Sequence, residues 1–273
     1  MNSVAANTSI TGGSGNDTIN MSTGLNSGDT IVGGGNLTAT TADRVTATIA
    51  GLSTVTGTGN LNISGVEFID LLTATSASTI SAASITGASY MNVGGPNGAA
   101  GVALTIEDLH VGTSVGVGEM ASTTNDEYTG TLTVSLADET GDADEITFLL
   151  ADTSNDDGVA ASLVTNAAVE TVNIAASANL VDTPADTNDA QLDISKVKAS
   201  TIVVSGGDSS YGEDLDLAGA GTATLHVNTS TVNAAAHKGT ITLIANPSTA
   251  LNYTSQGVVA QQITGSSKND ARP

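Results

Sequence analysis

The sequence predicts an all-β protein, and two observations lead to that class. Short runs of alternating apolar and polar residues recur along the chain, separated by Gly, Asn, Asp or Ser. This period of two is typical of β-strands, here at 43–49, 130–136, 145–150, 222–228 and 239–244. Aromatic residues make up only 2% of the chain, which favours thin layers of small apolar side chains over a bulky core. We therefore expect an elongated right-handed parallel β-solenoid with hairpin loops; tandem β-sandwich domains are the alternative.

The charge of the chain excludes several classes of partner. Its 273 residues include 28 Asp and Glu but only 6 Lys and Arg, for a net charge of −22. Between Arg44 and Lys196 there is no basic residue at all. Nucleic acids and anionic membrane surfaces both require clustered cations, so neither is an expected partner. An acidic excess of this size favours bound divalent cations, or high external salt, to offset self-repulsion.

The chain contains no Cys. An extracellular protein without disulfides needs another cross-link, and calcium bound by carboxylate and carbonyl oxygens can supply one. We expect no membrane span, because no run of 18 apolar residues occurs. The first residues show no secretion signal, so we expect either export without an N-terminal signal or an excised fragment.

Internal repeats indicate how the chain is organised. Residues 65–71 (GVEFIDL) resemble 168–174 (AVETVNI), and their glutamates are 170 − 67 = 103 residues apart. Residues 80–95 resemble 192–207, at an offset of 192 − 80 = 112. At the ends of the chain, 10–17 (ITGGSGND) resembles 263–270 (ITGSSKND). We therefore divide the chain into a calcium-binding segment (1–50), two β units (51–167 and 168–262) and the start of a further motif (263–273).

One motif carries recognisable chemistry. Residues 12–20 (GGSGNDTIN) fit the nonapeptide G-G-x-G-x-D-x-U-x, where U is a large aliphatic residue. Glycines permit turns with positive φ, the Asp supplies a charged oxygen ligand, and the aliphatic residue points into the core.

This nonapeptide resembles the repeats of the repeats-in-toxin (RTX) family, in which stacked turns bind calcium through Asp carboxylates and backbone carbonyls. The resemblance implies RTX-like β-roll segments and a calcium cofactor. It makes Asp17 the carboxylate ligand, Gly12 and Ser14 the carbonyl ligands, and Ile19 the core residue. A degenerate second copy places Asp29 as a ligand, 12 residues after Asp17 where strict repeats require nine, and a third unit begins at Asp43. Asp residues also shape turns without any metal, and that alternative stays open.

Acidic loops elsewhere are further candidates for calcium. Two of them contain Asp142 and Asp144, and Asp156 and Asp157; two more span 182–189 and 208–216. None fits the EF-hand spacing, and solvated loops are the equally simple alternative.

Catalytic motifs are weak, and we expect no enzyme. Residues 112–116 fit G-x-S-x-G, but that motif needs a strand–turn–helix setting that an all-β chain lacks. The three histidines, His110, His226 and His237, are dispersed and make no zinc pattern.

The composition also resembles the surface-layer proteins of Gram-negative bacteria that leave by type I secretion. That resemblance implies a secreted protein that forms a calcium-dependent lattice with copies of itself on the cell surface, with cell-surface polysaccharide as a second partner. One alternative is a calcium-rigidified extender or ligand-binding module of a large adhesin, including the ice-binding type, with Thr46, Thr48, Thr240 and Thr242 on a flat face. Another is a non-catalytic module of a polysaccharide-modifying enzyme.

Overall fold

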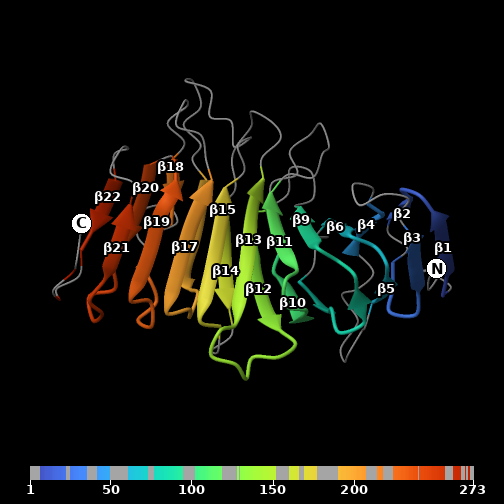
Figure 1. Ribbon diagram of the computed structural model, residues 1–273, viewed down its shortest axis with the longest axis horizontal. Helices are drawn as coiled ribbons and strands as arrows, with labels where there is room; N and C mark the ends of the chain where they lie inside the picture. Colours follow the sequence, from blue (N-terminus) through green and yellow to red (C-terminus); the bar gives the residue numbers. More distant parts are fainter. Residues whose placement is uncertain are drawn as a thin grey trace.

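The protein is a stack of parallel β-coils, seen from the side in the computed structural model of Figure 1. Every strand pairing among the described residues is parallel. This confirms the expected all-β parallel solenoid. Tandem β-sandwich domains, the alternative, would be built from antiparallel strands. The structure describes residues 7–22, 25–35, 42–49, 61–72, 77–94, 102–118, 128, 130–151, 160–165, 169–176, 190–206, 214–217, 224–238, 240–255, 261–265, 268 and 270.

One face of the solenoid is a ten-stranded sheet that runs through the whole stack. Its strands, in spatial order, are β2 (Thr18–Ser22), β4 (Arg44–Thr48), β6 (Phe68–Leu72), β9 (Tyr90–Gly94), β11 (Ser114–Gly118), β13 (Glu145–Ala151), β15 (Thr171–Ala176), β17 (Thr201–Gly206), β19 (Thr231–His237) and β21 (Asn252–Ser255).

The opposite strands form two sheets. A four-stranded sheet contains β1 (Ser9–Ser14), β3 (Thr30–Gly35), β5 (Asn62–Ser64) and β8 (Ile85–Thr86). An eight-stranded sheet contains β7 (Ser78–Ser81), β10 (Leu104–Leu109), β12 (Thr131–Leu136), β14 (Ala160–Thr165), β16 (Ala190–Lys196), β18 (Asp214–Asp216), β20 (Thr240–Ile244) and β22 (Gln261–Thr264). Across the described ranges, no helix is long and apolar enough to cross a membrane.

The core lies between these faces and is built from columns of like side chains. Val172, Ile202 and Val232 are paired in register on β15, β17 and β19, and each is 0% exposed. Alternate residues of a strand point to opposite faces, so the period of two in the sequence becomes one apolar column per inward position. Burying each such side chain stabilises the fold by about 1.5–3 kcal/mol. The thin coils depend on these aliphatic columns because the chain has few aromatic side chains.

Two aromatic side chains fill the middle of the stack. Phe148 on β13 and Tyr128 are both 0% exposed. The Tyr128 hydroxyl lies 2.8 Å from the Val102 carbonyl oxygen and 2.9 Å from that of Thr131. A buried hydroxyl needs such a partner, so Tyr128 ties two successive coils together.

The second face changes sheets in the fourth coil. That coil carries both β7, which begins the eight-stranded sheet, and β8, which ends the four-stranded one. In the next coil, β10 has an irregular register between Ile106 and Leu109, and Asp108 adopts a positive φ of 58°. The Ser81 hydroxyl donates a hydrogen bond to Asp108 Oδ2 at 2.7 Å. Asp tolerates this left-handed conformation better than most residues. Asp108 therefore stabilises the irregularity in β10, one coil after the second face changes from the four-stranded to the eight-stranded sheet.

The repeats seen in the sequence are one repeat of four coils. Glu67 precedes β6 and Glu170 precedes β15, and the sheet order β6-β9-β11-β13-β15 separates them by four steps. The second similarity links β7 to β16, again four steps apart in the order β7-β10-β12-β14-β16. The unequal offsets therefore reflect unequal coil lengths. Strand pairing continues from β13 to β15 across the boundary at 167/168.

We expect Phe148→Ala to lower the free energy of unfolding by ~3–5 kcal/mol, because it empties a large volume in a coil with few other ways to fill it. Chemical denaturation monitored by circular dichroism measures the change. Thr133→Ala, on the outward side of β12, is the matched control and should change stability by no more than about 0.5 kcal/mol. A loss below about 1 kcal/mol for Phe148→Ala would contradict the assigned core.

Candidate metal centre

The acidic residues of interest occupy one kind of corner, just before a strand of the ten-stranded sheet. In the first half of the stack, Asp17 precedes β2, Asp43 precedes β4 and Glu67 precedes β6. In the second half, Asp144 precedes β13 and Glu170 precedes β15. Because the strands are parallel and stacked, corners of successive coils lie directly beside one another.

At four corners a carboxylate accepts a backbone hydrogen bond from the coil before it: those of Asp43, Glu67, Glu170 and Asp270. Asp17 N–H donates to Asp43 Oδ1 at 2.7 Å, and Asp43 N–H donates to Glu67 Oε2 at 2.7 Å. Asp144 N–H donates to Glu170 Oε2 at 2.9 Å. Leu251 N–H, just before β21, donates to Asp270 Oδ1 at 2.9 Å. Asp270, in the terminal sequence echo, therefore accepts from the coil before it as Asp43 and Glu67 do.

Hydroxyl groups take over at the following corners. Ser89 Oγ donates to the Glu67 carbonyl at 3.2 Å, and Ser200 Oγ donates to the Glu170 carbonyl at 3.1 Å. One coil further, Thr113 Oγ1 donates to the Ala88 carbonyl at 3.0 Å. The corner ladder thus alternates between groups of acidic and neutral members along the stack.

Three carboxylate oxygens at the corners are buried without a hydrogen-bond partner. They are Oδ2 of Asp17, Asp43 and Asp144. Asp43 is itself 0% exposed. A buried charged oxygen with no donor is costly, so a cation or a proton beside each of these atoms would stabilise the fold.

Two of these oxygens lie beside a backbone carbonyl and a glycine. A Cβ placed on Gly12 would lie 2.5 Å from Asp17 Oδ2 and closer still to the Gly33 carbonyl oxygen. A Cβ placed on Gly33 would lie 2.5 Å from Asp43 Oδ2 and closer still to the Gly65 carbonyl oxygen. Each glycine therefore leaves a small space that an anionic oxygen and a carbonyl oxygen both border.

This donor set fits calcium better than a transition metal. Carboxylate and carbonyl oxygens are ligands that Ca²⁺ accepts, at 2.3–2.6 Å in general. Across the described residues, no group of three or more His, Asp or Glu side chains surrounds one site. The protein would thus supply few ligands per ion, with water completing the shell.

The remaining ligands predicted from the nonapeptide fall in different places. Gly12 forms the space beside Asp17, but Ser14 pairs with Gly35 in the four-stranded sheet and is exposed. Asp29 lies at another corner, before β3, and is 1% exposed. Its Oδ1 accepts the Thr8 N–H at 2.7 Å and its Oδ2 accepts the Asn26 N–H at 2.8 Å. Both carboxylate oxygens of Asp29 thus accept backbone N–H groups, as a turn-shaping residue would.

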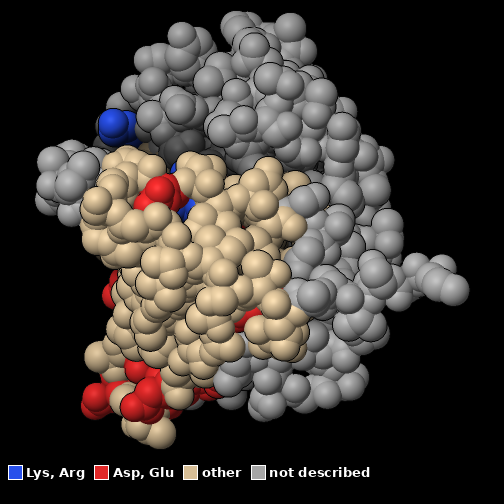
Figure 2. Space-filling view, turned by 90° about the vertical axis from the view of Figure 1, so that its right-hand side faces the viewer, with Lys and Arg blue, Asp and Glu red and all other residues tan. Residues whose placement is uncertain are grey.

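The acidic loop between β12 and β13 contributes one corner residue. Asp144 is at a corner, whereas Asp142 is exposed in the bend before it. Asp156 and Asp157 lie outside the described residues, as do 182–189 and 208–213. In the end-on view of Figure 2, acidic side chains gather at the lower end of the described surface.

Sequence reasoning missed three members of the corner ladder: Glu67, Glu170 and Asp270. The signal was present for the first two, because the similarity of 65–71 to 168–174 aligns Glu67 with Glu170. Asp270 was part of the terminal echo. None was assigned as a ligand, because only the fold shows that one acidic residue reaches the backbone of another coil.

The residues of the G-x-S-x-G match have structural positions. Gly112 has a positive φ of 88° in the turn before β11, and Ser114 is the first residue of that strand. A strand, not a helix, follows the turn, so the setting of a nucleophile elbow is missing here.

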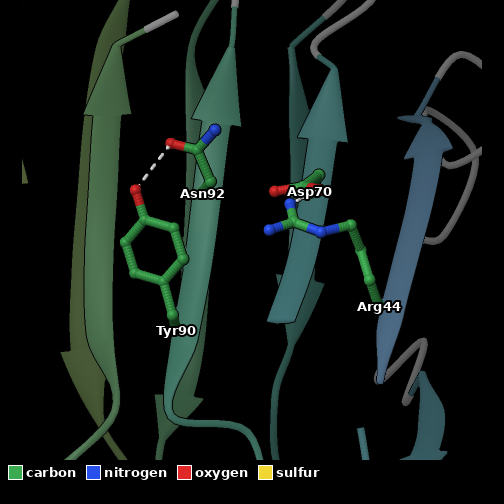
Figure 3. Close-up of polar contacts among 4 residues, drawn as sticks. All are labelled: Arg44, Asp70, Tyr90 and Asn92. Atoms are coloured by element: carbon green, nitrogen blue, oxygen red, sulfur yellow. Dashed lines mark hydrogen bonds and ion pairs between the residues drawn. The ribbon is translucent and has the colours of Figure 1, made fainter. Parts of the chain in front are cut away.

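A polar and aromatic cluster covers the outer side of β4, β6 and β9. Arg44 forms an ion pair with Asp70, and Figure 3 shows the two side chains meeting across neighbouring strands. The Arg44 guanidinium also lies 5.1 Å from the centre of the Phe68 ring. Phe68 packs edge-on against Tyr90, with ring centres 5.9 Å apart. The cluster therefore joins three coils beside the acidic corners.

Tyr90 lies across the neighbouring strand because Gly116 has no side chain. Its hydroxyl donates to Asn92 Oδ1 at 3.2 Å, as Figure 3 shows. A Cβ on Gly116 would collide with both of these groups. Burial raises the pKa of Tyr90 to about 12, and the Asp70 carboxylate adds to the rise while Arg44 opposes it.

Comparisons with protein-family models, with curated proteins and with solved structures found no match for this chain.

We expect Gly33→Ala to destabilise the protein by ~1–3 kcal/mol, because its methyl group would collide with the Gly65 carbonyl and approach Asp43 Oδ2. Gly35→Ala on the same strand is the matched control, since a Cβ there meets nothing within 4 Å. Denaturant unfolding of both variants, with and without calcium, makes the comparison. Equal stability of the two variants would show that the space beside Gly33 is not as tight as described.

Alkaline pH should destabilise the protein through its tyrosines. The pKa of Tyr90 is raised to about 12 by burial, against about 10 in an unfolded chain. Below pH ~10 this stabilisation is fully present, and it is lost as pH rises from ~10 to ~12 because the unfolded state releases its proton first. The free energy of unfolding, measured across that pH window, should fall less steeply for Tyr90→Phe than for the wild-type protein. The same slope for wild type and variant would contradict the burial of this hydroxyl.

Proposed function

We propose that this chain is a calcium-dependent structural protein of a bacterial cell surface, secreted and assembled with copies of itself into a surface layer. The observation that carries the proposal is the pair of buried, unpartnered oxygens of Asp17 and Asp43, each bordering the same space as a backbone carbonyl. Two electron-rich oxygens around one space repel each other unless a cation or a proton lies between them.

The net charge supports a cation over a proton. With 28 acidic residues against 6 basic ones, the chain repels itself, and the acidic corners add like charges side by side. In a calcium-poor cytoplasm this repulsion keeps the chain unfolded and exportable. Outside the cell, calcium bound only by the folded form stabilises that form by mass action.

The shape and surface favour a structural role. A stack of coils presents long flat faces, which suit side-by-side packing of copies. On the ten-stranded sheet, the outward Thr171, Thr201 and Thr231 lie in register and carry no charge. Copies of an acidic protein approach more easily through such a face than through its charged loops. Cell-surface polysaccharide is the proposed second partner.

The Thr171–Thr201–Thr231 row also favours a second candidate, an extender or ligand-binding module of an adhesin, including the ice-binding type. The Thr pairs that the sequence suggested do not form such a row. Thr46 lies between Asn20 and Asp70, and Thr242 pairs with Asp216. An adhesin module would be stiffened by calcium but would stay monomeric.

Calcium titration of the chelator-treated protein tests the proposal. Strand signal in circular dichroism and particle size in light scattering should rise together at millimolar calcium. Asp17→Asn and Asp43→Asn should each raise the calcium concentration at the midpoint of folding about tenfold or more, because each removes a ligand charge. Glu107→Gln, which removes one exposed charge on β10, is the matched control and should leave the midpoint unchanged.

Two results would overturn the proposal. One is an unchanged midpoint in both Asp variants. The other is a protein that is folded and monomeric with and without calcium. Folding that depends on calcium without any growth in particle size would leave the adhesin module as the better candidate.

A further inference from the structure

The Asp43–Glu67 pair has a counterpart four coils further along the stack. Asp144 and Glu170 stand at the corners before β13 and β15, as Asp43 and Glu67 stand before β4 and β6. The sheet order β4-β6-β9-β11-β13 places Asp144 four steps from Asp43. The separations in sequence are 144 − 43 = 101 and 170 − 67 = 103.

The two pairs share their hydrogen bonds. In each, the Asp N–H donates to the Glu Oε2, at 2.7 Å for Asp43 and 2.9 Å for Asp144. In each, the carbonyl of the Asp accepts from the strand after the Glu: Phe68 N–H donates to Asp43 at 3.0 Å and Thr171 N–H donates to Asp144 at 3.1 Å. Sequence similarity alone does not require this agreement, because the coils in between differ in length.

The surroundings of the pairs match as well. The residue before each Glu is a buried valine, Val66 at 0% and Val169 at 2% exposed. The next corner carries a serine whose hydroxyl donates to the Glu carbonyl, Ser89 at 3.2 Å and Ser200 at 3.1 Å. The corner after that carries a threonine whose hydroxyl bonds an alanine carbonyl: Thr113 donates to Ala88 and Thr229 to Ala199.

Each pair also holds a buried oxygen with no hydrogen-bond partner. Asp43 is 0% exposed and its Oδ2 has none; Asp144 is partly exposed, but its Oδ2 is buried and also has none. Gly141 faces the Asp144 carboxylate, since a Cβ on Gly141 would lie 3.2 Å from Asp144 Oδ1 and 3.5 Å from Oδ2. A glycine thus adjoins the unpartnered carboxylate at both corners, but the space beside Gly141 is wider than that beside Gly33 and no backbone carbonyl lies as close to it.

We infer that the Asp144–Glu170 corner is a divalent-cation site in its own right, outside the nonapeptide motif, and that cation binding recurs every four coils. Strands lie about 4.8 Å apart, so the two sites are separated by about 19 Å and bind independently. Calcium as the ion rests on the proposed function; the position of the site rests on the repeated geometry.

The chemistry of the site favours a hard cation bound weakly. Asp144 and Glu170 supply two carboxylates, and neither His nor Cys lies among the residues of this corner described above. Carboxylates with backbone oxygens and water suit Ca²⁺, and so few charged ligands correspond to a dissociation constant of ~0.1–1 mM, as in extracellular modules. Such a site would be filled outside a cell and empty inside it.

Equilibrium dialysis of the full chain against radioactive calcium, up to about 10 mM, tests the inference. Asp144→Asn and Glu170→Gln should each lower the number of ions bound per chain by one, and the double variant should lose no more than either single variant. Asp43→Asn should lower the number independently, so that it adds to the loss from Glu170→Gln. Glu107→Gln, an exposed acid on β10, is the control and should keep the wild-type number.

Hydrogen exchange of the wild-type protein covers the case in which a variant fails to fold. Exchange is compared at saturating calcium and at calcium that is barely sufficient for folding. The amides of Asp144, Glu170 and Thr171 should be more protected at saturating calcium, and magnesium should not produce the same protection.

Unchanged stoichiometry in both variants, or unchanged protection at these amides while those of Asp17 and Asp43 respond, would overturn the inference and leave the proposed function standing. A proton in place of the ion at Asp144 would give this result. No response at either pair would overturn both.

Discussion

Backbone groups at the corners set the main physical constraint on this stack of coils. Where a strand of the ten-stranded sheet begins, its leading N–H needs an acceptor, and strand pairing has not yet started. At several coils the acceptor is the carboxylate at the corner of the next coil: the Asp17 N–H donates to Asp43, and the Asp144 N–H donates to Glu170. These contacts fix the register of each strand against the strand of the next coil, and that register lines up the apolar side chains of the core in columns.

The same solution concentrates negative charge. Asp43 accepts a backbone N–H with one carboxylate oxygen and leaves the other buried without a partner, and Asp17 and Asp144 also each bury one carboxylate oxygen without a partner. Serine and threonine corners, such as Ser89 and Ser200, join coils without this cost. The acidic corners therefore make the stability of the fold depend on whatever neutralises them, and the proposed calcium-triggered folding outside the cell would use this dependence.

The sequence anticipated some residues of the candidate site and missed others for a physical reason. The nonapeptide named Asp17 and Gly12 as calcium ligands, and the structure places Gly12 beside Asp17 Oδ2 because a tight glycine turn is a local feature. It treated Asp29 as equivalent to Asp17, although Asp29 closes a turn onto Thr8 and Asn26 at a different corner. Asp43 and Glu67 lie 24 residues apart and meet only because one full coil separates them. A coil length varies with its loops, so no fixed spacing in the sequence could reveal that contact.

The sequence by itself determined the class of fold. Its period of two, its β-branched residues and its lack of large rings leave a thin all-β stack as the arrangement that can bury them. The tertiary structure alone decided which residues share a corner, since parallel stacking brings together positions that are 19 to 30 residues apart, at intervals that differ from coil to coil. It also showed that two sequence repeats with unequal offsets are one repeat of four coils. The number of strands between the copies is the same, whereas the number of residues differs with the length of the loops.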